Sequence, residues 1–498
     1  MTHPATLRWQ PSLLRKEGWG ICALVIRPSF RAAKRGQSSV AMTGESITSC
    51  DLHLPPITYI LHYLFMKNNI LIIGAGAAGL MAARTLSNAG KQVTVLEARN
   101  RMGGRIHSIS DASFFTNTEL GAEFIHGNLP VTLQLLKEAK ISYRSANAEM
   151  WRYEKGEFNE NSMIIEDWDL LIKRLNELDQ DTNIYDFLQK EFPGGKYEEL
   201  RSTVWAYVSG YDTADPRDAS AFALRNEWQH EQEDAQHRID GGYCSIINYL
   251  ANECKGKGGQ IFLNAVVKEI QWQSGNVKAI TEDGTTYEAE QLLIAMPLGV
   301  LQALEGETGA ITFKPQIPAH TKAIQQMGFG AVIKLLYEFD TAFWLDDKAR
   351  KMAGKNIGKM GYLFSDEEIP TWWTQIPDHS IVLTGWIGGP AAADKTNMPD
   401  TEVLEQGLQS LANIFKIDLE ELKVKLIAYR IMNWTADLFT RGSYAYDTVE
   451  APEARKILNT PVEDTLFFTG EYLYEGTEMG TVEAALTSGL EVAKRILK

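Results

Sequence analysis

The chain has 498 residues, of which 44% are hydrophobic and 23% charged, and its formal net charge is −15. These fractions are ordinary for a globular protein and exclude disordered and fibrous classes, while the length predicts about three domain-sized units at about 150 residues each. The longest apolar run, residues 55–65, is shorter than the about 18 residues that a membrane span needs. An acidic chain argues against a nucleic-acid partner and suits cationic ligands.

Cysteine and histidine spacing gives no sign of a metal site. The four cysteines, Cys22, Cys50, Cys244 and Cys254, form no CxxC pair, and the nine histidines include no HExxH. This pattern argues against a disulfide scaffold and a zinc site, and it fits a reducing compartment. We therefore expect a cytoplasmic protein without a bound metal.

Residues 1–65 differ in charge from the rest of the chain. They carry a net charge of +4, which leaves −19 for residues 66–498. Met66 precedes an apolar run, residues 70–73, as in a protein that begins with a βαβ unit. We interpret residues 1–65 as a non-core extension, either translated upstream of the true start or a targeting segment; a working domain is the third alternative.

The stretch 70–97 is typical of a dinucleotide site, because a strand, a glycine-rich turn, a helix and a second strand follow one another. Gly74 permits a tight turn, Gly76 lets backbone approach a pyrophosphate, and Gly79 lets helix and strand pack closely. Phosphates would meet the free N–H groups of the helix N-terminus. Glu97 follows Gly79 by 18 residues, where a carboxylate accepts hydrogen bonds from a ribose and repels a 2′-phosphate.

A Gly-Gly-Arg sequence at residues 103–105 follows the second strand. It places flexible backbone and a guanidinium, with its planar fork of donors, near the phosphates. Together, residues 70–105 resemble the start of the flavin-containing amine oxidase family, which comprises monoamine oxidases, polyamine oxidases and the catalytic domain of lysine-specific histone demethylases. Further segments resemble the family in the same order: 238–243, 261–270, 293–301, 328–334, 434–437, 442–446, 467–471 and 480–489.

The resemblance covers nearly all of residues 66–498 and implies an α/β fold, in which a Rossmann-like FAD-binding domain is interleaved with a mixed α+β substrate-binding domain. The FAD-binding domain is expected from residues 66–112, 238–303 and 441–498, and the substrate domain from residues 113–237 and 304–440. Within the substrate domain, the patterns predict helices at 167–179 and 197–207 and a strand at 333–339.

The resemblance also implies which residues hold FAD. Val267 would contact adenine through its backbone, Glu471 would lie at the ribityl–phosphate region, and the helix opened by Thr481 would face the flavin ring. Ser443 stands where similar monoamine oxidases carry the cysteine that bonds the flavin, so FAD is expected to be non-covalent. The predicted cofactor-binding residues are Gly74, Gly76, Ala77, Ala78, Gly79, Glu97, Ala98, Arg99, Gly104, Arg105, Gly121, Ala122, Glu123, Val267, Trp434, Gly470, Glu471, Thr481 and Val482.

The reaction implied by the resemblance is hydride transfer from the carbon next to an amine to flavin N5, followed by imine hydrolysis and reduction of O2 to H2O2. Lys334 would hold a water that bridges to N5, and Tyr444 would form one wall of an aromatic slot. His126 would hydrogen-bond the substrate amine, and Glu123 would pair with a distal ammonium. Lys334, Tyr444 and His126 are thus the predicted catalytic residues.

The subfamily prediction rests on residues 120–127, which resemble polyamine oxidases. Thr477, a fourth predicted substrate residue beside Glu123, His126 and Tyr444, stands near the place where monoamine oxidases carry a second tyrosine. A polyamine-type substrate is therefore preferred, with a small-molecule amine and O2 as the only expected partners.

Three alternatives stay open: a monoamine oxidase, a flavin dehydrogenase or desaturase acting on an apolar substrate, and a flavoprotein that binds without turnover. Lys334, Tyr444 and His126 argue against the dehydrogenase or desaturase, and Lys334 together with the aromatic motif argues against binding without turnover. The exact amine, the oxidised carbon, the physiological electron acceptor and the oligomeric state are not predicted.

Overall fold

The computed structural model describes residues 68–110, 113–127, 129–160, 167–230, 236–354, 356–476 and 478–498. The predictions made for residues 1–65 and for Thr477 lie outside these ranges. Over the described ranges, no helix combines the length and the apolar character of a membrane span. The same residues contain no cluster of three His, Cys, Asp or Glu side chains suited to a metal ion.

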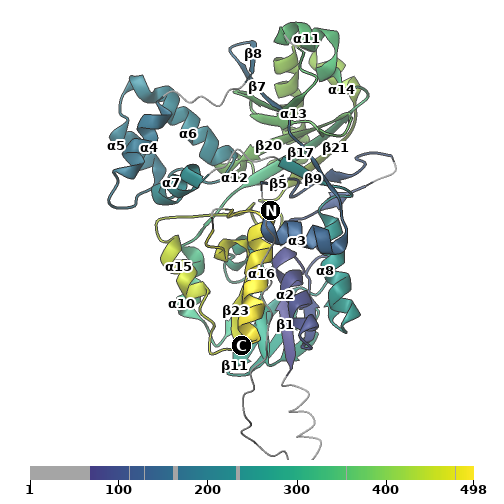
Figure 1. Cartoon of the computed structure of the whole chain (residues 1–498), viewed down its shortest axis with the longest axis vertical. Coiled ribbons are helices and arrows are strands. Elements are labelled where there is room, and N and C mark those ends of the chain that lie inside the picture. The colour runs from purple at the N-terminus through teal and green to yellow at the C-terminus, as the bar shows by residue number, and fades with distance from the viewer. Residues whose placement is uncertain are drawn as a thin grey trace, which may run out of the picture. The chain divides into compact units, whose positions relative to one another are not determined.

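A five-stranded parallel sheet forms the base of the molecule in Figure 1. Its strands, in spatial order, are β10 (Gln260–Phe262), β2 (Gln92–Leu96), β1 (Asn69–Ile73), β14 (Gln291–Ile294) and β23 (Leu466–Phe468). Parallel sheets are covered on both faces, and β1 is accordingly buried from Ile70 to Ile73. Ile70 and Ile72 belong to one hydrophobic cluster and Leu71 and Ile73 to another, as the period of two along a strand requires.

Helices cover one face of this sheet, and a second sheet covers the other. Figure 1 shows the yellow α16 beside the purple α2, with α8 on the far side of α2. The helices of the first layer are α2 (Ala77–Asn88), α3 (Pro130–Ala139), α8 (Cys244–Gly256) and α16 (Val482–Ile496). The second layer holds β11 (Val267–Gln273), β12 (Asn276–Thr281), β13 (Thr286–Ala289), β15 (Thr312–Lys314), α10 (Pro318–Gln325) and α15 (Ala451–Leu458).

A seven-stranded sheet organises the upper part of Figure 1. In spatial order its strands are β21 (Leu426–Asn433), β17 (Val332–Phe339), β20 (Val382–Gly388), β19 (Thr371–Trp373), β18 (Met360–Ser365), β7 (Glu149–Glu154) and β8 (Glu157–Glu160). Its pairs are antiparallel except β18 with β7. Helices α11 (Asp347–Ala353), α12 (Gly389–Ala393), α13 (Asp400–Phe415) and α14 (Leu419–Lys425) accompany it.

A group of helices with a hydrophobic cluster of its own lies beside this sheet. It consists of α4 (Trp168–Asn176), α5 (Ile184–Glu191), α6 (Glu198–Gly210) and α7 (Ala221–His230). The predicted helices at 167–179 and 197–207 and the predicted strand at 333–339 are confirmed as α4, α6 and β17. The parallel sheet entered through a βαβ unit, together with the mixed sheet and its helices, confirms the predicted fold class.

Short elements complete the described chain. They are β3 (Ser108–Ile109), β4 (Thr118–Glu119), β5 (Ile125–His126), β6 (Tyr143–Ser145), β9 (Gln236–Ile239), α9 (Leu298–Leu301), β16 (Gly328–Phe329) and β22 (Ala445–Tyr446), with 3-10 helices at Gly195–Tyr197, Phe343–Leu345 and Glu471–Leu473. The residue boundaries of the two domains stay a prediction. Helix α3, from the range 113–237, and α10, from the range 304–440, both pack in the hydrophobic clusters of the parallel sheet.

Buried carboxylates close the N-termini of two helices on this sheet. Glu483 accepts hydrogen bonds from the backbone N–H groups of Val131 (2.8 Å) and Thr132 (2.7 Å) at the start of α3. Glu119 Oε1 accepts from the Tyr243 N–H (2.8 Å) at the start of α8. A negative charge at a helix N-terminus is favourable, so each carboxylate ties segments that are far apart in sequence.

Of these two carboxylates, Glu119 is the one whose ionised form is destabilised by burial. Burial raises its pKa to about 7, although the bonds from Tyr243 and Ser108 oppose that shift. Its Oε2 is buried and meets no hydrogen-bond partner among the described residues. The folded protein therefore holds a proton on Glu119 at a pH where the unfolded chain has released it.

We predict that the Glu119→Gln variant removes part of the pH dependence of stability. The folded-state pKa lies above the ordinary value of 4.5, so the free energy of unfolding falls as pH rises through the window from 4.5 to about 7. The loss amounts to roughly 3 kcal/mol. Urea unfolding at pH 5 and pH 8 measures it, with Glu157→Gln on an exposed strand position as the matched control. An unchanged pH dependence in Glu119→Gln would refute the prediction.

Candidate functional site

A cavity of ≈ 2210 Å³ runs between the parallel sheet and the upper part of the chain. It begins at the glycine-rich turn after β1 and reaches α6, α7 and strands β18 to β20. Pockets for single small ligands occupy about 300–1,000 Å³, so this cavity has room for a dinucleotide together with a second molecule.

The glycine-rich turn lies at one end of the cavity, and each glycine has a separate reason to be there. A Cβ on Gly74, whose φ is +105°, would lie 2.5 Å from the Ala295 carbonyl oxygen. A Cβ on Gly79 would lie 2.0 Å from the Gly74 oxygen, so α2 packs directly on the turn. A Cβ on Gly76 would meet no protein atom within 4 Å. Gly76 lines the cavity, so the space it leaves open belongs to a ligand.

Helix α2 presents its N-terminus to this space. Its N-cap, Gly76, supplies no side-chain hydrogen bond, and its first turn contains no acidic residue. The first N–H groups of the helix are thus left for a ligand, and the positive end of the helix dipole favours phosphate.

Glu97 is placed for a ribose at the end of β2. Its carboxylate accepts hydrogen bonds from the N–H groups of Ala75 (2.8 Å) and Arg99 (2.9 Å). Burial raises its pKa above the ordinary value, against the opposing effect of these two bonds. Further polar hydrogens, such as those of ribose hydroxyls, would satisfy the carboxylate in this buried position.

Arg105 joins the first and last segments of the site. Its Nη1 donates to Glu471 Oε1 (2.8 Å) and to the Ser443 carbonyl (2.6 Å). Arg99 pairs in the same way with Asp437, and its guanidinium lies over the ring of Trp434 at 5.9 Å. The guanidinium groups are therefore fixed before any ligand binds.

Nearly every predicted cofactor residue lines the cavity. Gly79 is the exception, because it is buried beneath the turn. The lining residues are Gly74, Gly76, Ala77, Ala78, Glu97, Ala98, Arg99, Gly104, Arg105, Gly121, Ala122, Glu123, Val267, Trp434, Gly470, Glu471, Thr481 and Val482. The open space at Gly76, the uncapped helix and the buried Glu97 together fit a dinucleotide.

The predicted catalytic side chains lie on the same cavity. Lys334 is in β17, where all eight residues are buried, and its side chain is 1% exposed. Its Nζ donates to Glu123 Oε2 at 2.6 Å and to the Gly121 carbonyl at 3.1 Å. The structure thus places an ammonium at the wall where the parallel-sheet part meets the upper sheet.

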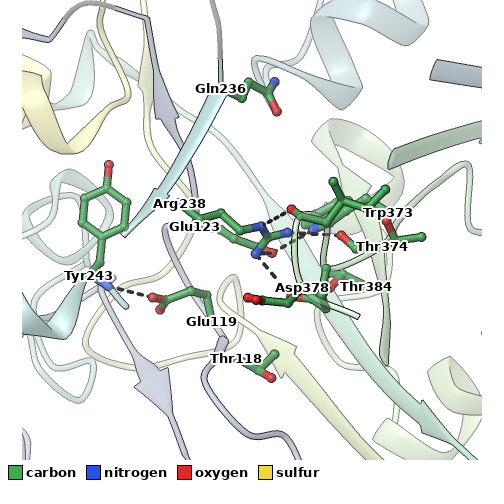
Figure 2. Close-up of polar contacts among 12 residues, drawn as sticks. Thr118, Glu119, Glu123, Gln236, Arg238, Tyr243, Trp373, Thr374, Asp378 and Thr384 are labelled. Atoms are coloured by element: carbon green, nitrogen blue, oxygen red, sulfur yellow. Dashed lines mark hydrogen bonds and ion pairs between the residues drawn. The ribbon is translucent and has the colours of Figure 1, made fainter. Parts of the chain in front are cut away.

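Besides Lys334, Glu123 accepts hydrogen bonds from two other side chains, Arg238 and Trp373, which Figure 2 draws beside it. Its Oε1 accepts from Arg238 Nη1 (2.5 Å) and from Trp373 Nε1 (3.1 Å). Burial opposes the ionisation of Glu123, but the charges of Lys334 and Arg238 outweigh it and lower its pKa below the ordinary value. Both carboxylate oxygens accept bonds from the protein, and pairing of Glu123 with a substrate ammonium stays a prediction.

His126 and Tyr444 also lie on the cavity wall. Burial lowers the pKa of His126 to about 4, so its imidazole is neutral at neutral pH. The Tyr444 hydroxyl donates to the Tyr211 carbonyl. Burial, together with the negative charge of Asp212, raises the Tyr444 pKa well above its ordinary value and keeps the hydroxyl protonated.

Sequence reasoning assigned no role to Arg238, although it opens one of the quoted motifs, and it missed Trp373 altogether. An arginine within the strand β9 is a signal for a buried carboxylate partner, because a buried charge must be paired. No pattern in the sequence around Trp373 indicates that it belongs to the site. Other aromatic side chains on the cavity wall that were not predicted are Phe124, Tyr211, Tyr362, Phe364 and Trp386.

Two glycine variants distinguish the ligand-binding role of the glycine-rich turn from its packing role. We predict that Gly76→Ala folds like the wild type and binds the dinucleotide roughly 10- to 100-fold more weakly, because its Cβ enters the space left for the ligand. Gly79→Ala should instead lower stability by about 1–3 kcal/mol, because its Cβ meets backbone. Cofactor titration and urea unfolding measure the two effects.

Gly256→Ala is the control for this pair, because a Cβ there meets no atom within 4 Å and Gly256 is not on the cavity. Equal cofactor affinity in Gly76→Ala and Gly256→Ala would contradict the assignment of the glycine-rich turn to the dinucleotide site.

Residues 77–497 match the model of a protein family described as flavin containing amine oxidoreductase. Polyamine oxidase 4 of Oryza sativa subsp. japonica is 29% identical over 462 residues, which cover 86% of this chain and 89% of that protein. Lysine-specific histone demethylase 2 of Homo sapiens is 29% identical over 473 residues, and the match covers 88% of this chain and 54% of the demethylase.

Solved structures show the same fold. Wild-type putrescine oxidase bound to putrescine has a TM-score of 0.70 at 20% identity, over 86% of this chain and 99% of that one. Cyclohexylamine oxidase from Brevibacterium oxydans IH-35A has a TM-score of 0.68 at 18% identity, over 86% of this chain and 98% of that one. The family match spans most of the chain, from the first residue of α2 to beyond Lys334: the chain belongs to the flavin-containing amine oxidoreductases, and its cofactor is FAD.

Proposed function

We propose that the protein oxidises a polyamine-type amine with non-covalent FAD and releases H2O2. When bound, FAD supplies the acceptor for a hydride from the carbon next to the amine nitrogen and returns the electrons to O2, while water hydrolyses the substrate imine. The residues of the chain bind the amine, keep it neutral and exclude bulk water. The relatives named as polyamine oxidase support the substrate class.

Oxidation requires the substrate amine to be neutral and held in a fixed orientation. His126 is neutral, so its imidazole has a nitrogen lone pair that accepts a hydrogen bond from the amine. The Lys334 ammonium lies on the same cavity wall and disfavours a second positive charge beside it. Both groups therefore favour the neutral amine, whose nitrogen lone pair is needed for oxidation.

Aromatic rings build the wall on which the substrate would lie. Trp373 and Trp386 have ring centroids 5.8 Å apart, and Tyr362 stacks with Phe364 at 6.4 Å. The Tyr444 ring packs on Gly480, where a Cβ would lie 2.8 Å from the ring. Such a wall excludes water and suits the methylene chain of an alkylamine.

The observation that carries the polyamine proposal is the placement of carboxylates on this aromatic cavity. Asp212 and Glu227 lie close enough to Tyr444 for their charges to raise its pKa. Further acidic side chains line the cavity: Glu198, Glu199, Glu475 and Glu478. A polyamine carries ammonium groups separated by methylene chains, and this wall offers carboxylates to the former and aromatic surface to the latter.

Ser443 supports non-covalent binding of the cofactor. Its Oγ hydrogen-bonds with Thr213 Oγ1, and the described cysteines, Cys244 and Cys254, do not line the cavity. We predict that acid precipitation of the purified yellow protein releases all of its flavin into the supernatant. Absorbance of the supernatant and pellet measures this, and flavin retained in the washed, denatured pellet would contradict it.

Peroxide release from a panel of amines tests the substrate class. We expect release with spermine or spermidine and little with benzylamine, tyramine or L-amino acids. Glu227→Gln and Asp212→Asn should raise the KM for spermidine about 3- to 10-fold each, through the loss of one charge pair, and leave kcat nearly unchanged. Glu157→Gln, on an exposed strand away from the cavity, is the control.

Two outcomes would overturn this substrate class. Release with aromatic amines alone would favour a monoamine oxidase. Yellow protein that releases no peroxide with any amine would favour a flavin dehydrogenase.

A further inference from the structure

Four segments that are far apart in the chain meet at one buried ionic cluster, and Figure 2 shows its members Glu123, Arg238 and Trp373. Lys334 comes from β17, Glu123 from the loop before β5, Arg238 from β9 and Trp373 from β19. The side chains of Lys334, Glu123 and Arg238 are 1%, 4% and 10% exposed. Burying two cations and one carboxylate costs free energy of folding, so we expect this cluster to have a role other than stability.

Arg238 is held rigidly by the loop that joins β19 to β20. It donates to the carbonyl oxygens of Ile376 (3.0 Å) and Thr374 (3.1 Å) and to the Gln375 side chain (3.2 Å). Its guanidinium also lies 4.5 Å from the centroid of the Phe124 ring. Arg238 therefore presents Nη1 to Glu123 from a fixed position and holds that carboxylate in its ionised form.

Glu123 in turn directs Lys334. An ammonium has three N–H donors. Those of Lys334 reach Glu123 and Gly121, and within the described ranges it has no third acceptor. Because Lys334 lines the cavity, the remaining N–H is available to the cavity side. Without Glu123 the buried ammonium would keep the Gly121 carbonyl and the Trp373 ring, 5.3 Å from Nζ, but no counter-charge, so its charged form would be unstable or would turn away.

We propose that Glu123 is a positioning residue, held by Arg238 and Trp373, that fixes the charge and direction of Lys334 at the flavin end of the cavity. The effect of Glu123 on turnover rests on the proposed function; its effect on the environment of the flavin rests only on the FAD site. Glu123 then acts through Lys334, because both of its carboxylate oxygens already accept hydrogen bonds from the protein. Glu119, Tyr362 and Asp378 are the other described titratable groups that interact with this cluster.

A double-mutant cycle tests the proposal, with Glu123→Gln, Lys334→Met and the two combined in the FAD-loaded enzyme. We expect Glu123→Gln to lower kcat about 100-fold, the cost of a misplaced catalytic group, with little change in KM. In the Lys334→Met background the same substitution should change kcat by no more than about 2-fold, because it has no lysine left to act on. Equal losses in both backgrounds would overturn the proposal.

The second measurement does not depend on turnover. The absorption spectrum of bound FAD, titrated with pH, reports the charge beside the ring. Glu123→Gln should shift this titration as Lys334→Met does, and the double variant should show no further shift. Glu157→Gln, at an exposed strand position away from the cavity, is the control that should leave the titration close to wild type. A wild-type titration in Glu123→Gln would refute the proposal.

Glu123→Asp covers the case in which Glu123→Gln fails to fold. It keeps the charge but shortens the reach, so it should retain the wild-type flavin titration, lower kcat, and lose that effect in the Lys334→Met background. A shifted titration in Glu123→Asp would count against the proposal. If the wild type oxidises no amine, the proposed function fails, while the flavin titrations still decide the role of Glu123.

Discussion

A charged lysine in the middle of a fully buried strand is the constraint around which the upper part of the molecule is arranged. All eight residues of β17 are buried, and Lys334 is one of them. Its ammonium requires a carboxylate, and Glu123 supplies it; that carboxylate then lies between two cations and requires a fixed guanidinium, which Arg238 supplies. The seven-stranded sheet and the loops beside the glycine-rich turn thus meet at the cavity wall that carries the predicted catalytic residues.

The same principle joins the interleaved segments of the FAD part. Arg105 binds Glu471, and Arg99 binds Asp437, so the first segment of the cofactor site is tied to segments more than three hundred residues later. Ion pairs of this kind add little stability when they are exposed to solvent, but these are partly buried and fixed in geometry. They keep the cradle in shape while the chain passes back and forth between the two parts.

Local patterns predicted the dinucleotide turn well, because the functions of Gly74, Gly76, Gly79 and Glu97 depend on spacing within a single βαβ unit. The cofactor side of the cavity lining was also predictable, since the resemblance carried those positions over in order, whereas aromatic wall residues such as Trp373 and Trp386 were not predicted. The hydrogen-bond partners of Lys334 were not predictable from the sequence. Glu123 is 211 residues away from Lys334 in sequence and 115 from Arg238, and no periodicity reports contacts between different strands and loops. The role of Glu119 as the cap of α8 could not be predicted for the same reason.

The cap that Glu483 places on α3 has a consequence for how the protein is made. Helix α3 begins at Pro130, but the carboxylate that caps its N-terminus lies on α16, near the end of the chain. The edge strand of the parallel sheet, β23, also comes from this last part of the sequence. The FAD part is therefore finished only when the final segment emerges from the ribosome. Folding from the N-terminus onward, which is common among multidomain chains, cannot complete this part in order.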